Sequence, residues 1–128
     1  MGRKYLDDLN VADRADLWLP NDKRQAQWAK EREEYGFDER EIWSLDDTFY
    51  CWLYERLKMF IARKCVNLNY HTFEYKGETL TQEQCLNRML EGLEIALTKE
   101  RAYCTMEDLT KIDDATNIWT LVIHQVWT

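Results

Sequence analysis

The side chains best suited to nucleophilic or metal chemistry in this chain are four cysteines and two histidines. They are Cys51, Cys65, Cys85, Cys104, His71 and His124. Zinc sites usually contain close pairs of ligands, and the chain has no CxxC or similar pair. A cysteine nucleophile needs a histidine base beside it, which here only the tertiary structure could supply. We therefore predict no metal ion and no cofactor, with reduced cysteines that behave as small apolar side chains.

Carboxylates are numerous, and several occur as adjacent pairs such as Asp46-Asp47 and Asp113-Asp114. Adjacent residues on a helix diverge by about 100° and do not converge on one substrate atom. We interpret both pairs as helix-capping or exposed side chains. The chain also lacks a glycine-rich phosphate loop, GxSxG and HExxH. The sequence thus predicts a protein that is not an enzyme, and a site assembled from scattered acids and His71 is the alternative that stays open.

The formal net charge of −7 limits the class of partner. Affinity for nucleic acid comes mainly from Lys and Arg, so we expect no direct nucleic-acid binding. An acidic surface can nevertheless compete with nucleic acid for a basic protein. No run approaches 18 apolar residues, and the opening MGRKYLDDLN lacks the apolar region of a signal peptide. We expect no membrane association and a cytoplasmic location.

Six tryptophans are many for 128 residues, and some can serve a partner rather than the core. Leu17 and Trp18 form an apolar cluster before Pro20, and Trp28 is nearly alone among the charged residues 21–35. One interpretation is a peripheral helix that Trp28 pins to the protein. The other is an arm in which Leu17, Trp18 and Trp28 anchor a partner protein.

Three stretches repeat apolar residues at steps of three and four, which predicts core helices near 45–65, 82–98 and 106–127. Capping boxes precede them, with Ser44, Thr81 and Thr105 as the caps. We expect the first helix to contribute most to the core. Its apolar stripe comprises Leu45, Phe49, Trp52, Leu53, Leu57, Phe60 and Ile61. A strand is the alternative for the end of the chain, because IWTLVIHQVW is β-rich in composition.

The remaining segments complete a mainly α fold, a small bundle of three core helices with a β-hairpin and a peripheral N-terminal helix. FEYKGETL alternates and turns at Lys76-Gly77, which predicts the hairpin. Gly92 weakens the second core helix, and a close crossing against the first would explain it. Gly36 ends the N-terminal helix. We divide the chain into a charged arm, 1–36, and a helical core domain, 37–128, in which Phe37, Ile42 and Trp43 face the core.

The run GFDEREIWSLDDTFYCWLYERLK resembles a motif of small uncharacterised phage and prophage proteins. In these a Gly-aromatic-Ser/Asp opening precedes Trp-Ser/Asn-Leu-Asp and an apolar helix that ends in Arg-Leu-Lys. The matching residues are Gly36, Phe37, Asp38, Trp43, Ser44, Leu45, Asp46, Arg56, Leu57 and Lys58. LNRMLEGLEIAL and the aromatic end at Trp127 are similar to theirs as well. The resemblance implies a phage or mobile-element origin and carries no assigned function, and the charged arm departs from it.

Acidic charge and spare tryptophans together predict a non-enzymatic, phage-encoded binding protein. We expect it to occupy a surface of a host protein, for instance a defence or nucleic-acid-handling factor, in the cytoplasm of an infected or lysogenic cell. The alternative is a self-associating structural or assembly protein of a phage, which would be a homo-oligomer.

Overall fold

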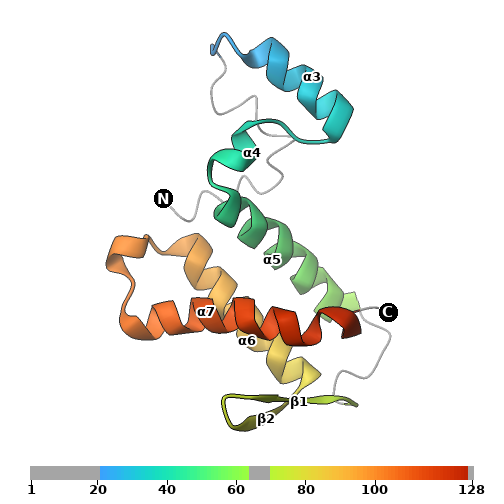
Figure 1. Ribbon diagram of the computed structural model, residues 1–128, viewed down its shortest axis with the longest axis vertical. Helices are drawn as coiled ribbons and strands as arrows, with labels where there is room; N and C mark the ends of the chain where they lie inside the picture. Colours follow the sequence, from blue (N-terminus) through green and yellow to red (C-terminus); the bar gives the residue numbers. More distant parts are fainter. Residues whose placement is uncertain (1–20, 64–69, 127–128) are drawn as a thin grey trace.

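The computed structural model describes residues 21–63 and 70–126 and confirms the mainly α fold (Figure 1). The helices are α3 (Gln25–Tyr35), α4 (Arg40–Trp43), α5 (Leu45–Arg63), α6 (Gln82–Thr98) and α7 (Met106–Val122). The strands are β1 (Thr72–Tyr75) and β2 (Glu78–Thr81), and the 3-10 turns are η1 (Arg101–Tyr103) and η2 (Ile123–Gln125). The described end of the chain is therefore helical, as predicted, and not a strand.

α6 is the centre of the bundle, because both α5 and α7 pack against it (Figure 1). It begins at the predicted capping box, in which Thr81 accepts the backbone N–H of Gln84 and the Gln84 side chain accepts that of Thr81. Its buried apolar side chains are Cys85, Leu86, Met89, Leu93 and Leu97. The expectation that the first core helix contributes most is wrong, since Leu45 and Trp52 on the stripe of α5 are exposed.

Gly92 lies where α6 crosses α7. A Cβ built on Gly92 would lie 2.8 Å from the Cβ of Ala115 and closer still to the carbonyl oxygen of Lys111. The predicted close crossing exists, but its partner is α7 and not the first core helix. α7 itself begins at the predicted box, with hydrogen bonds between Thr105 and Asp108 in both directions.

The hairpin turns at Lys76-Gly77, as predicted. Both residues have positive φ, 49° and 79°, which is the two-residue turn whose twist matches that of paired strands. A lone hairpin is marginally stable, and this one is fixed to α7. The hydroxyl of Tyr75 donates to Asp114 Oδ1, and Lys76 Nζ lies 2.8 Å from the same oxygen. Asp114 is therefore a tertiary contact, and its interpretation as a capping or exposed residue is wrong.

We predict that Asp114→Asn loosens the hairpin and lowers the free energy of unfolding by about 1 kcal/mol, since the amide oxygen still accepts from Tyr75 but Lys76 loses its counter-charge. Burial raises the pKa of Asp114, but hydrogen bonds from Lys76 and Tyr75 outweigh it and hold the pKa below its usual range. The stabilisation is thus present above the unfolded pKa and lost as pH falls through the folded one. Urea unfolding at several pH values measures it. The exposed neighbour provides the control, Asp113→Asn, and an equal loss there would contradict the prediction.

α3 and α4 form a separate layer at the far end of α5 from the hairpin (Figure 1). Two Asp-x-Arg brackets, Asp22–Arg24 and Asp38–Arg40, enclose Trp28 in this layer. In each bracket the carboxylate accepts the backbone N–H and the guanidinium of the arginine two residues later. The arginines flank the indole of Trp28, with guanidinium carbons 4.9 and 4.0 Å from the ring centroid. α3 thus begins after Arg24, and it ends at Gly36 with φ of 83°, as predicted.

Trp28 is fully buried. Its ring meets the edge of Trp43 at 5.8 Å, and its indole N–H donates to Glu39 Oε2 at 3.2 Å. The predicted boundary between residues 36 and 37 falls inside this cluster, since residues on both sides of it contact Trp28. The interpretation of Trp28 as a pinning residue agrees with the structure, but it pins α3 to α4.

Candidate protein-binding groove

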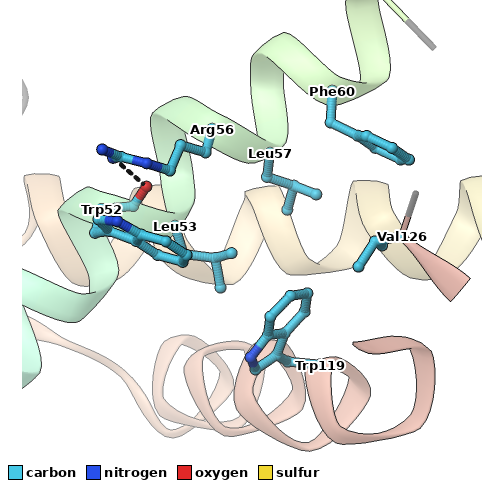
Figure 2. Close-up of a pocket in the computed structure, with 7 residues that line it drawn as sticks. All are labelled: Trp52, Leu53, Arg56, Leu57, Phe60, Trp119 and Val126. Carbon is cyan, nitrogen blue, oxygen red and sulfur yellow. Dashed lines mark hydrogen bonds between the residues drawn. The ribbon is translucent and has the colours of Figure 1, made fainter. Parts of the chain in front are cut away.

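An open apolar groove runs between α5 and the end of α7 (Figure 2). Its volume is about 240 Å³. It is lined by Trp52, Leu53, Arg56, Leu57, Phe60, Trp119 and Val126. The five residues of α5 recur at helical spacing and share one face. Figure 2 shows the ring of Trp119 pointing from α7 toward the leucines of α5.

The groove has a buried floor and an exposed aromatic rim. Leu53 and Leu57 are almost completely buried, whereas Trp52 is 47% exposed. Phe60, Trp119 and Val126 are partly buried against the core. A further apolar side chain in the groove would cover the rim indole and contact the leucines below, and each Å² of apolar surface so removed from water is worth about 25 cal/mol.

Arg56 is the one ionisable residue among the seven that line the groove. Its Nη1 donates to the carbonyl oxygen of Trp52 at 3.1 Å, and its guanidinium lies 4.8 Å from the centroid of the Trp52 ring (Figure 2). This is the snorkelling arrangement expected for an arginine at the edge of an apolar stripe. The stacked guanidinium orients the indole and places a positive charge at the rim, where it can meet a carboxylate of a bound chain.

The lining of the groove suits binding better than catalysis. It contains neither a nucleophile nor a general base within its seven residues. Tryptophan and arginine are the residue types that dominate the binding energy of protein interfaces. An amphipathic helix that presents apolar residues one turn apart is the kind of segment such grooves hold.

The anchors predicted from the sequence are not the residues that the structure exposes. Trp28 is buried in the bracket cluster, so its indole is not available to a partner in this conformation. Leu17 and Trp18 lie outside the described residues. Trp52, which the periodicity assigns to the core, is half exposed instead. The exposure of Trp52 could have been predicted from the sequence, because Arg56 follows Trp52 by one helical turn at the edge of the apolar stripe.

Three aromatic or apolar residues that precede α5 are also more exposed than predicted. Phe37, Ile42 and Trp43 were expected to face the core, and they are 43, 57 and 49% exposed. The reason is that α4 packs with α3 and lies away from α6 and α7 (Figure 1). This leaves a second apolar surface near the turn at Gly36.

Among the residues that the structure describes, two thiols lie in the core and both imidazoles lie at the surface. Cys51 and Cys85 are buried, and burial raises the pKa of the Cys51 thiol to about 12, which makes it unreactive at neutral pH. Cys65 lies outside the described residues. His71 meets the ring of Tyr70 edge-on, and His124 is exposed. Within residues 21–63 and 70–126 no group of three His, Cys, Asp or Glu side chains is placed to hold a metal ion.

The comparisons with known proteins place the chain in no protein family, and its described helices include no candidate membrane span. None of the helices in the described ranges has both the length and the apolar character needed to cross a membrane. No family model matches the chain, and neither a curated protein nor a solved structure was found to match it.

Proposed function

We propose that this chain is a non-catalytic binding protein that holds an apolar segment of a partner protein in the groove between α5 and α7. The observation that supports the proposal is an open apolar groove with a half-exposed tryptophan, Trp52, at its rim. Arg56 favours a segment that carries a carboxylate beside its apolar residues. The net charge of −7 favours a protein over a nucleic acid as the partner.

The resemblance to phage and prophage proteins leads us to propose a bacterial host protein as this partner, for instance a defence or nucleic-acid-handling factor. Binding in the host cytoplasm would mask the surface that the partner segment normally uses. An amphipathic helix is the segment that we propose, because its apolar residues at steps of three and four match a groove walled by one helix face.

We predict that Trp52→Ala lowers the affinity for the partner by about tenfold or more, as truncation of an interface tryptophan typically does. The matched control is Trp43→Ala, since Trp43 is equally exposed but does not line the groove. The wild-type chain and both variants serve as bait in parallel captures from a bacterial lysate. The partner is the protein that the Trp52 variant loses and the Trp43 variant keeps, and calorimetry with the purified pair gives the two affinities.

Equal capture and equal affinity for the two variants would contradict a role of the groove. Thermal unfolding of both variants accompanies the measurement, so that a loss of binding through loss of fold is recognised. We expect little loss of stability for Trp52→Ala, because about half of its indole is already in water. Trp43→Ala should cost more, because the Trp43 ring also packs against buried Trp28.

A second candidate function, self-association, is favoured by a specific pattern on α5. Leu45, Trp52 and Met59 recur every seven residues and are all exposed, which is the spacing of a helix–helix seam. Light scattering at increasing concentration tests it. Met59→Glu would dissociate such a dimer without touching the groove lining, whereas Trp119→Ala changes the groove and leaves the seam intact. If Met59→Glu dissociates a dimer and Trp119→Ala does not, the partner is a second copy of this chain and not another protein.

A further inference from the structure

We infer that the pocket between the end of α3 and α4 binds a basic side chain of a partner polypeptide, with an arginine guanidinium as the group that fits it best. The pocket has a volume of about 300 Å³. Its lining consists of Glu31, Tyr35, Phe37, Asp38, Glu39 and Ile42. The inference does not rest on the groove between α5 and α7, which is formed by other residues.

The walls of the pocket are exposed apolar and aromatic side chains. Tyr35 and Phe37 stand on either side of Gly36, with ring centroids 5.9 Å apart and planes inclined by 34°. Gly36 has φ of 83°, the left-handed conformation that ends α3 and brings the two rings together. Ile42 on α4 adds an aliphatic surface to the wall, and it is mostly exposed. These side chains form exposed surface that a long aliphatic stem can cover.

The three carboxylates of the pocket differ in whether an arginine neutralises their charge. Asp38 is neutralised by Arg32 and Arg40, whose guanidinium nitrogens both lie 2.9 Å from its Oδ2. Glu31 instead accepts from the backbone N–H of Glu39 at 2.9 Å and from the side-chain amide of Gln27. All of these Glu31 donors are neutral.

Glu39 is also held by a neutral donor. Its Oε2 accepts from the indole N–H of Trp28, and within residues 21–63 and 70–126 neither Glu31 nor Glu39 forms an ion pair. Neutral donors fix the two carboxylates in place, and the charge of Glu39 is offset only in part, by the nearby but unbonded guanidinium of Arg24. The pocket therefore carries two oriented negative charges beside two aromatic rings.

This combination selects a cation with an apolar stem. A guanidinium stacks on aromatic faces and forms paired hydrogen bonds to carboxylates. A neutral side chain of the same length gains only the apolar contacts. An anionic group is repelled by Glu31 and Glu39. The net charge of −7 would also speed the approach of a basic partner.

The test is a titration of the full chain, followed by NMR, with the peptide acetyl-GLRLG-amide and with a second peptide in which citrulline replaces the arginine. Citrulline keeps the shape of arginine and removes its charge. We expect the arginine peptide to shift the ring signals of Tyr35 and Phe37 and the methyl signals of Ile42. The citrulline peptide should bind about tenfold more weakly, through loss of the cation–ring and charge-assisted contacts.

Two double variants test the role of the carboxylates. Glu31→Gln/Glu39→Gln removes the two charges of the pocket, and Glu33→Gln/Glu34→Gln is its control. Both doubles change the net charge equally on the same part of the chain, and glutamine oxygens can still accept from the Glu39 N–H and the Trp28 indole. Glu33 and Glu34 are exposed on α3 and do not line the pocket. We expect the first double to weaken the arginine peptide about tenfold and the second to leave it nearly unchanged.

Equal binding of the citrulline peptide, or equal weakening by the two doubles, would overturn the inference. Shifts confined to Trp52 and Trp119 would overturn it as well, since the leucines of the peptide would then occupy the groove. That last result would support the proposed function, so failure of the pocket and failure of the groove give different spectra.

Discussion

Asp38→Asn is expected to unfold α3 and α4 while α5, α6 and α7 stay folded. The Asp38 side chain is completely buried, and so is that of Arg40, one of its two arginine partners. Removing one member of a buried ion pair typically costs about 3–5 kcal/mol, because a buried charge loses one of its counter-charges. We expect about 3 kcal/mol here, because the asparagine oxygen can keep one hydrogen bond.

The loss should stay local because of how the layer is built. α3 has a single buried residue, Trp28, and that residue is held by the guanidinium of Arg40 and by Glu39. The bundle has its own continuous core around α6. α3 also lies at the far end of the molecule from α6 and α7 (Figure 1). A layer with so little apolar burial belongs to the least stable part of a fold.

Hydrogen exchange measures the effect residue by residue. We expect the α3 amides, including the N–H of Trp28, to exchange roughly a hundredfold faster in the variant, which corresponds to about 3 kcal/mol. The amides of α6 should be unchanged. The matched control is Asp22→Asn, because Asp22 and Arg24 form the same bracket with far more exposed side chains. A small effect in the control and a large one at Asp38 would show that burial, rather than the motif, makes the bracket essential.

The pH dependence of the layer gives an independent check of the same ion pair. Burial tends to raise the pKa of Asp38, but hydrogen bonds from Arg40 and Arg32 outweigh it and lower the pKa. The stabilisation is therefore complete above the unfolded pKa, near 3.9, and is lost as pH falls through the folded value. Glu41 acts in the opposite sense, since burial and the charge of Asp38 raise its pKa. Protection of α3 that is equal in wild type and variant at neutral pH would contradict the prediction.

The parts of the fold that the sequence predicts best depend on neighbours within a few residues. The capping boxes at Thr81 and Thr105 need partners only three positions away, and both form. The turn at Lys76-Gly77 depends on two residues and the alternation beside them. Propensity and capping are local effects, so one sequence is enough to reveal them.

The arrangement of the helices could not be predicted in the same way. Apolar stripes on α5, α6 and α7 look alike in sequence, but α6 alone is covered by both of the others. The stripe of α5 is wider than its contact with α6, and Trp52 is left at the rim of a groove. Which part of a stripe is covered depends on the tertiary structure, and the hydrophobic spacing does not contain that information.

The bracket cluster of the N-terminal layer could have been found and was missed. Asp22-x-Arg24 and Asp38-x-Arg40 repeat the same pattern on either side of Trp28, the one tryptophan of the charged stretch. A tryptophan between two such arginines suggests stacking and not an exposed anchor. The hydrophobic periodicity hides this arrangement, because the side chains that lie over the ring of Trp28 are charged.

Gly92→Ala is expected to destabilise the bundle although alanine is the better helix former. In an exposed helix the change would stabilise by about 0.5–1 kcal/mol. At this position the new Cβ would overlap the backbone carbonyl of Lys111 and lie 2.8 Å from the Cβ of Ala115. Both neighbours belong to α7, and a backbone carbonyl cannot rotate away as a side chain can.

α7 must therefore move away from α6, which loosens the contact around Ile118 and Met89, both fully buried. Overpacking of this kind costs about 1–3 kcal/mol, and the backbone clash places Gly92→Ala near the upper end of that range. Urea unfolding measures the loss, and near-ultraviolet circular dichroism reports on the packing of the aromatic residues.

The control is the difference between Glu94→Gly and Glu94→Ala. It makes the same glycine-to-alanine change two residues later, at an exposed position of α6. There alanine should be the more stable residue by about 0.5–1 kcal/mol, the opposite sign from the effect at Gly92. The same sign at both positions would mean that α6 and α7 do not cross closely at Gly92. The order of the bundle, with α6 at its centre, would then have to be abandoned.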